Sequence, residues 1–118
     1  MGLSMGGGAV MEYGAYYGKR IAAMVPMAEC NGATSTKAQA IAKSGVAVWG
    51  FHNRYDPRVS YLCTYNYVNS INNYNPLKVA KKTIWTDGQN HNCWSRASDP
   101  NFKENNMSIY QWMLTQKR

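Results

Sequence analysis

Strand-like segments that alternate with helix-like segments constrain the fold of this chain most strongly. The expected strands lie at 20–27, 46–51 and 79–86, and the first two are continuous apolar runs. Such runs are typical of strands that are buried on both faces of a parallel sheet. The expected helices lie at 9–17, 36–43, 59–71 and 106–116. This order predicts one α/β domain over residues 1–118, with a parallel sheet of about three strands flanked by helices.

The connections predict how the sheet is arranged. Right-handed crossovers favour strands that lie in sequence order, which leaves the 21–27 strand at an uncovered edge. Pro26 is expected to mark the end of that strand, since proline cannot donate to a ladder. In the 59–71 helix we expect Leu62, Tyr65 and Val68 to face the sheet.

Charge and composition argue against two classes of partner. The 13 Lys and Arg residues outnumber the six Asp and Glu residues, which gives a net charge of +7. These basic residues occur singly or in pairs, without the stripe or the interleaved aromatics of a nucleic-acid-binding protein, so we expect no nucleic-acid partner. No apolar run is long enough to span a membrane, so we expect no membrane partner either.

The metal-ligating residue types are scattered. Cys30, Cys63 and Cys93 are widely spaced and odd in number, which excludes a disulfide framework and a Cys-x-x-Cys site but allows one internal bridge. His52 has no second His or Cys at metal spacing, so a hydrogen-bonded structural role is expected for it. The sequence therefore predicts no metal and no cofactor.

The chain begins with the pattern Gly2-x-Ser4-x-Gly6, followed by a helix-like segment. This pattern fits a nucleophile elbow, a strained turn that exposes a serine hydroxyl, with glycines where side chains would collide with backbone. The helix N-terminus and the amide of Met5 would then stabilise an oxyanion. A simple flexible glycine-rich turn explains the same five residues equally well.

An acid and a histidine follow the next two strands. Asp56 lies in the loop after 46–51, and His91 lies after 79–86. Because the carboxyl ends of parallel strands meet at one edge, the order Ser, Asp, His predicts a catalytic triad there. The alternatives are an Asp-Pro turn at Asp56-Pro57 and a solvated loop histidine at His91.

Four stretches together resemble the C-terminal half of bacterial serine esterases of the α/β-hydrolase superfamily, the predicted-peptidase, phospholipase/carboxylesterase and polyhydroxybutyrate-depolymerase-like group. The stretches are GLSMGGGAVMEYGAYYGKRIAAMVPM, VAVWGFHNRYDPRV, DGQNHNCW and NMSIYQWMLTQKR. The resemblance implies Ser4 as nucleophile, Asp56 as acid, His91 as base and Met5 as an oxyanion-hole amide. It also places Trp94 beside the site, as packing or as a substrate contact.

The resemblance further implies that the N-terminal half of the fold, with the strand entering the elbow and the second oxyanion donor, would precede Met1. Loss of one oxyanion donor costs on the order of 100- to 1,000-fold in turnover, so low activity on a small-molecule or polymeric ester is expected. The alternative is a non-catalytic interaction module. In both cases the uncovered strand edge is expected to bind a second copy or a complementary N-terminal half.

Overall fold

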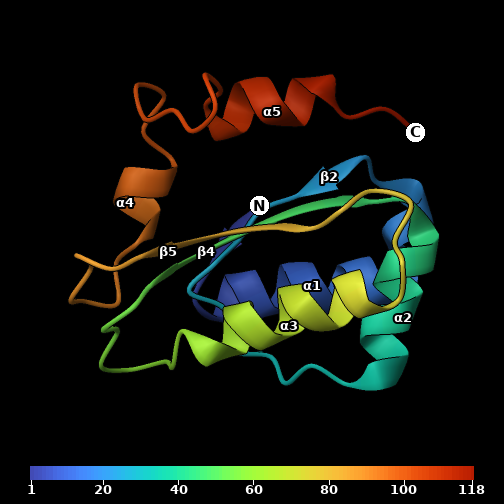
Figure 1. Cartoon of the computed structure of the whole chain (residues 1–118), viewed down its shortest axis with the longest axis horizontal. Coiled ribbons are helices and arrows are strands. Elements are labelled where there is room, and N and C mark those ends of the chain that lie inside the picture. The colour runs from blue at the N-terminus through green and yellow to red at the C-terminus, as the bar shows by residue number, and fades with distance from the viewer.

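The computed structural model describes residues 1–118 as five parallel strand segments and five α-helices (Figure 1). The strands are β1 (Gly2–Leu3), β2 (Ala23–Met24), β3 (Pro26–Met27), β4 (Ala47–Asn53) and β5 (Lys81–Trp85). The helices are α1 (Met5–Tyr17), α2 (Ser35–Ser44), α3 (Leu62–Asn73), α4 (Trp94–Ala97) and α5 (Ile109–Thr115). None of these helices combines the length and the apolar character needed to cross a membrane.

The sheet is built around β4. Segments β2 and β3 pair with β4 in one continuous register, since Met24 opposes Val48 and Met27 opposes Phe51. Phe51 also opposes Thr83 of β5, so β5 lies on the other side of β4. With β1 paired to β3, the strands lie in the predicted sequence order and are all parallel.

The edge of the sheet differs from the expectation in two ways. Pro26 does not end its strand but begins β3, where it opposes Gly2 of β1. The residues entering the elbow therefore form a short strand of their own, and the amide of Gly2 donates to the Val25 carbonyl at 3.1 Å. Only the β2 part of the 21–27 strand is an uncovered edge.

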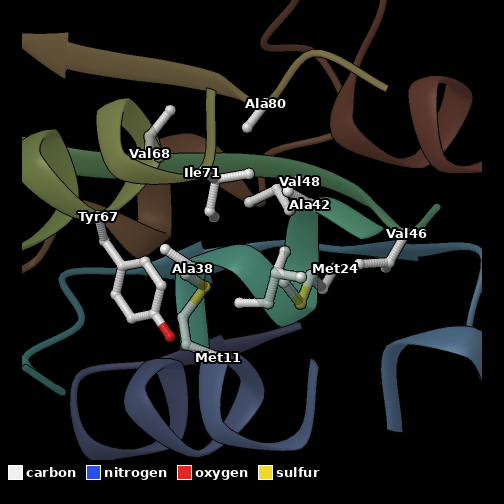
Figure 2. Close-up of a cluster of buried hydrophobic side chains, with 11 residues drawn as sticks. Met11, Met24, Ala38, Ala42, Val46, Val48, Tyr67, Val68, Ile71 and Ala80 are labelled. Atoms are coloured by element: carbon white, nitrogen blue, oxygen red, sulfur yellow. The ribbon is translucent and has the colours of Figure 1, made fainter. Parts of the chain in front are cut away.

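Both faces of β4 are covered by helices, and every β4 residue is buried. Val48 faces a cluster shared with α1, α2 and α3, which includes Met11 and Tyr67 (Figure 2). Trp49 and Phe51 belong to a second cluster with α4 and α5, which lie on the opposite side of the sheet (Figure 1). This alternation along the strand produces two hydrophobic layers.

Two helices depart from the sequence pattern. In α3, Leu62 and Tyr65 are exposed, and the buried residues are Thr64, Tyr67, Val68 and Ile71. The helix lies against Gly50, whose missing side chain lets Thr64 approach the sheet. Helix α4 lies in a segment that was expected to be loop, and it places Ala97 in the second cluster.

Glu29, directly after β3 and Ala28, is a buried carboxylate with incomplete hydrogen bonding. It is only 1% exposed. One carboxylate oxygen accepts the Asn31 amide at 2.9 Å, whereas the other oxygen has no partner. Burial raises the pKa of Glu29 above its usual value, because the charged form loses its hydration. The ionised carboxylate therefore costs stability at neutral pH.

We predict that Glu29→Gln raises the melting temperature at pH 7 by roughly 5 °C, because it removes the buried charge but keeps an acceptor for Asn31. The native state holds its proton to higher pH than the unfolded chain, so wild-type stability falls as pH rises above about 4.5, the ordinary value. The gain should thus vanish near pH 4.5 in thermal melts followed by circular dichroism.

Glu12→Gln is the matched control. Hydrogen bonding to Lys37 lowers the pKa of Glu12, the opposite direction. This substitution at a half-buried, ion-paired residue should therefore leave the melting temperature at pH 7 unchanged or lower it. An equal gain from both variants would contradict the role assigned to burial at Glu29.

Candidate active site

Ser4 occupies the turn between β1 and α1 in a strained backbone conformation. Its φ is 51° and its ψ is −121°, a combination that costs a non-glycine residue roughly 1–3 kcal/mol. Two backbone hydrogen bonds hold it there: the Ser4 amide donates to Met27 at 2.8 Å, and the Ser4 carbonyl accepts from Gly8 at 3.1 Å. The chain turns sharply from strand to helix at this serine, which has the form of a nucleophile elbow.

Close backbone contacts explain only part of the glycine pattern. A Cβ on Gly2 would lie 2.4 Å from the Gly6 carbonyl oxygen, and a Cβ on Gly7 would lie 2.8 Å from that of Met27. A Cβ on Gly6 would meet nothing within 4 Å. The expected collision is therefore correct at Gly2 and wrong at Gly6, and Gly7 is the second position that requires glycine.

Asp56 lies in the loop after β4 with its side chain fully shielded from solvent. One carboxylate oxygen accepts the amides of Arg58 and Val59 at 2.8 and 2.9 Å. Burial by itself raises the pKa of Asp56, but the hydrogen bonds from His91 and from these amides outweigh it and hold the pKa below the usual value. The carboxylate is thus ionised at neutral pH, although it is buried.

His91 bridges the acid and the serine. Its Nδ1 lies 2.7 Å from the second oxygen of Asp56, and its Nε2 lies 2.8 Å from the Ser4 hydroxyl oxygen. A carboxylate only accepts, so Nδ1 carries the proton and Nε2 accepts from the serine hydroxyl. The structure therefore brings the three predicted residues together in the series Ser4, His91, Asp56.

The loop that carries His91 is anchored from two sides. The Asn53 side chain at the end of β4 donates to the Asn90 carbonyl at 2.9 Å. The Trp94 ring, on the first turn of α4, packs edge-on against the His91 imidazole with ring centroids 5.3 Å apart. Trp94 also packs against the second hydrophobic cluster, so the base lies against a fixed wall.

Met5 begins α1 directly after the serine. The first amides of a helix have no carbonyl four residues earlier within that helix, so they remain free to bind an anion. Met5 is 88% exposed. Its position matches that expected for an oxyanion donor.

His52 contacts the same Asp56 oxygen as the base, a contact that the sequence pattern did not predict. It is completely buried, and its Nε2 lies 3.0 Å from the Val59 carbonyl and 3.3 Å from Asp56. Nδ1 accepts from the Thr64 hydroxyl at 2.9 Å, since both Nε2 partners are acceptors. Burial lowers the pKa of His52 and keeps it neutral. The spacing of four residues between His52 and Asp56 was the only signal in the sequence.

Cys93 lies two residues after the base, and its amide donates to the His91 carbonyl at 3.1 Å. Cys93 is buried, and burial raises its pKa to about 12, which leaves the thiol protonated. No cluster of three or more His, Cys, Asp or Glu side chains is arranged to hold a metal. The two cavities, of about 370 and 230 Å³, lie around Ser44, and neither is lined by Ser4, Asp56 or His91.

Comparison with solved structures shows that the chain has a known fold. A thermostable esterase superposes with a TM-score of 0.77 and 21% identity over 99% of this chain and 30% of its own. The chain has part of the α/β-hydrolase fold. A protein from Klebsiella pneumoniae assigned as a dienelactone hydrolase superposes with a TM-score of 0.60 and 13% identity, over 94% of this chain and 46% of its own. The chain thus spans less than half of each hydrolase, and the sequence matches no protein-family model and no curated protein.

The glycine contacts of the turn around Ser4 predict an unequal response to alanine. Gly2→Ala should lower the melting temperature by roughly 10 °C, because backbone must move to admit the new Cβ. Gly6→Ala is the matched control, and it should leave the melting temperature unchanged or slightly higher, since alanine favours helix. Equal losses in thermal melts of the two variants would contradict the packing assigned to this turn.

Proposed function

We propose that this chain is a serine hydrolase that acts on carboxylic esters through an acyl-enzyme. The observation that carries the proposal is the hydrogen-bonded series Ser4–His91–Asp56, with heavy-atom distances of 2.8 and 2.7 Å. A nucleophile, a base and a group that orients the base are the parts required for nucleophilic acyl transfer. Their place at the carboxyl ends of three parallel strands of an α/β-hydrolase fold agrees with this chemistry.

The first half of the reaction uses the hydrogen bonds already present. Ser4 Oγ attacks the ester carbonyl while its proton passes to His91 Nε2. Asp56, ionised and buried, stabilises the resulting imidazolium through Nδ1–H. The Met5 amide donates to the oxyanion. His91 then gives the proton to the leaving alcohol, and Ser4 is left acylated.

The second half repeats the sequence with water. His91 Nε2 removes a proton from a water molecule, whose oxygen attacks the acyl carbon. Collapse of the second tetrahedral intermediate returns the proton to Ser4 Oγ and releases the carboxylic acid. These steps use only side chains and one backbone amide of this chain.

Two structural neighbours support esters as the substrate class. One is an esterase, and another is assigned as a dienelactone hydrolase, and a lactone is a cyclic ester. The triad lies outside both cavities of the chain, so neither cavity limits the size of the ester. We propose that the Trp94 ring contacts the substrate and places its carbonyl beside His91.

The uncovered part of the sheet edge supports a second candidate, a non-catalytic interaction module. Segment β1 covers Pro26–Met27, but Ala23–Met24 pairs only with β4. A free strand edge can accept a strand from another polypeptide or from a second copy. A concentration-independent monomer in sedimentation equilibrium at micromolar concentration would contradict pairing with a second copy.

Hydrolysis of p-nitrophenyl acetate tests the leading proposal. Ser4→Ala and His91→Asn should each remove nearly all of the enzymatic rate and leave only the residual catalysis that substrate binding and the oxyanion donor provide, and Asp56→Asn should reduce the rate by about 10²- to 10⁴-fold. Ser60→Ala, at an exposed serine, is the matched control and should leave the rate unchanged. The matching p-nitroanilide should react much more slowly. A rate that survives Ser4→Ala would overturn the assignment.

A further inference from the structure

Two of the three cysteines form a pair at or near the surface. The Sγ atoms of Cys30 and Cys63 are 3.3 Å apart, although the residues are separated by 33 positions. Cys30 is exposed in the loop that leaves β3, and Cys63 is half-buried in the first turn of α3. Neither residue takes part in the proposed hydrolysis.

We propose that Cys30 and Cys63 are a site of reversible covalent modification, which a small disulfide such as oxidised glutathione converts into an intramolecular disulfide. A disulfide requires an S–S distance of about 2.05 Å, so the sulfurs need only a small movement to reach it. The loop continues through Gly32, where an added Cβ would meet no atom within 4 Å. Packing around Gly32 therefore does not oppose this movement.

The reaction proceeds by two exchanges in a fixed order. The Cys30 thiolate attacks the external disulfide and forms a mixed disulfide, which releases one small thiol. Cys63 then gives its proton to solvent, and its thiolate attacks the Cys30 sulfur; the bond from Cys30 to the small thiol breaks, and the released thiolate takes up a proton. Two electrons and two protons pass from the protein thiols to the two released thiols. Cys30 reacts first because it is exposed, whereas burial raises the pKa of Cys63 to about 12.

The bridge would link the loop after β3 to the start of α3, two segments that lie far apart in the sequence. The closed segment, residues 30–63, contains α2, β4 and the loop that carries Asp56. Cross-linking a segment of this length restricts the unfolded chain. Oxidation should therefore stabilise the chain and hold the start of α3 against the loop after β3.

Intact-protein mass spectrometry after incubation with oxidised glutathione tests the proposal. The native chain should lose two hydrogen atoms, retain no glutathione and melt on the order of 10 °C higher, with full reversal by dithiothreitol. Cys63→Ser should instead retain one glutathione on Cys30, and Cys30→Ser should not react. Cys93→Ser is the matched control and should lose two hydrogen atoms as the native chain does, because Cys93 is buried and takes no part in the bridge.

Two results would overturn the proposal. One is stable glutathione on both Cys30 and Cys63 without a bridge, and the other is a bridge found only between two copies of the chain. Either result would show that the two thiols do not meet in solution. Mass and melting temperature do not depend on hydrolysis, so this test stands apart from the proposed function.

Discussion

The burial of β4 on both faces is the constraint on which the rest of the structure depends. A strand with no exposed residue must pair on both sides and be covered by helices above and below. The partners β2, β3 and β5 satisfy the first requirement, and the two hydrophobic clusters satisfy the second. All of these strands run parallel, so their carboxyl ends meet at one edge of the sheet.

The last two residues of β4 organise that edge. His52 contacts Asp56, and Asn53 contacts the backbone of Asn90, one residue before His91. One buried strand therefore positions both the loop of the acid and the loop of the base. Ser4 is held separately, through hydrogen bonds between the elbow and β3, which is itself paired to β4. The strain at Ser4 is thus supported by the same sheet that fixes its partners.

The sequence predicted those parts of the fold that depend on local pattern. Apolar runs located the strands, and their order predicted the parallel sheet and the edge at which Ser4, Asp56 and His91 meet. Contacts between distant segments were not predictable in this way. The predicted inward face of α3 was wrong at Leu62 and Tyr65, which are exposed. The close approach of Thr64 to Gly50 sets how the helix is rotated against the sheet.

The same limit applied to the site. Spacing along the sequence identifies candidate site residues. The contact of His52 with Asp56 and the pairing of Cys30 with Cys63 depend instead on how the loops pack. Pro26 begins β3 and lies opposite β1, which consists of only the two residues before the elbow. Turn chemistry alone gives no signal for such a short strand.

Labelling with a serine-directed fluorophosphonate tests the central claim, that the fold activates Ser4 through His91. We predict a single adduct, mapped to Ser4 by peptide mass spectrometry. The adduct should form in the native chain and be lost in His91→Asn and in denaturant. Labelling of Ser4 that is no faster than that of the exposed Ser60, or that is unaffected by His91→Asn, would contradict the account.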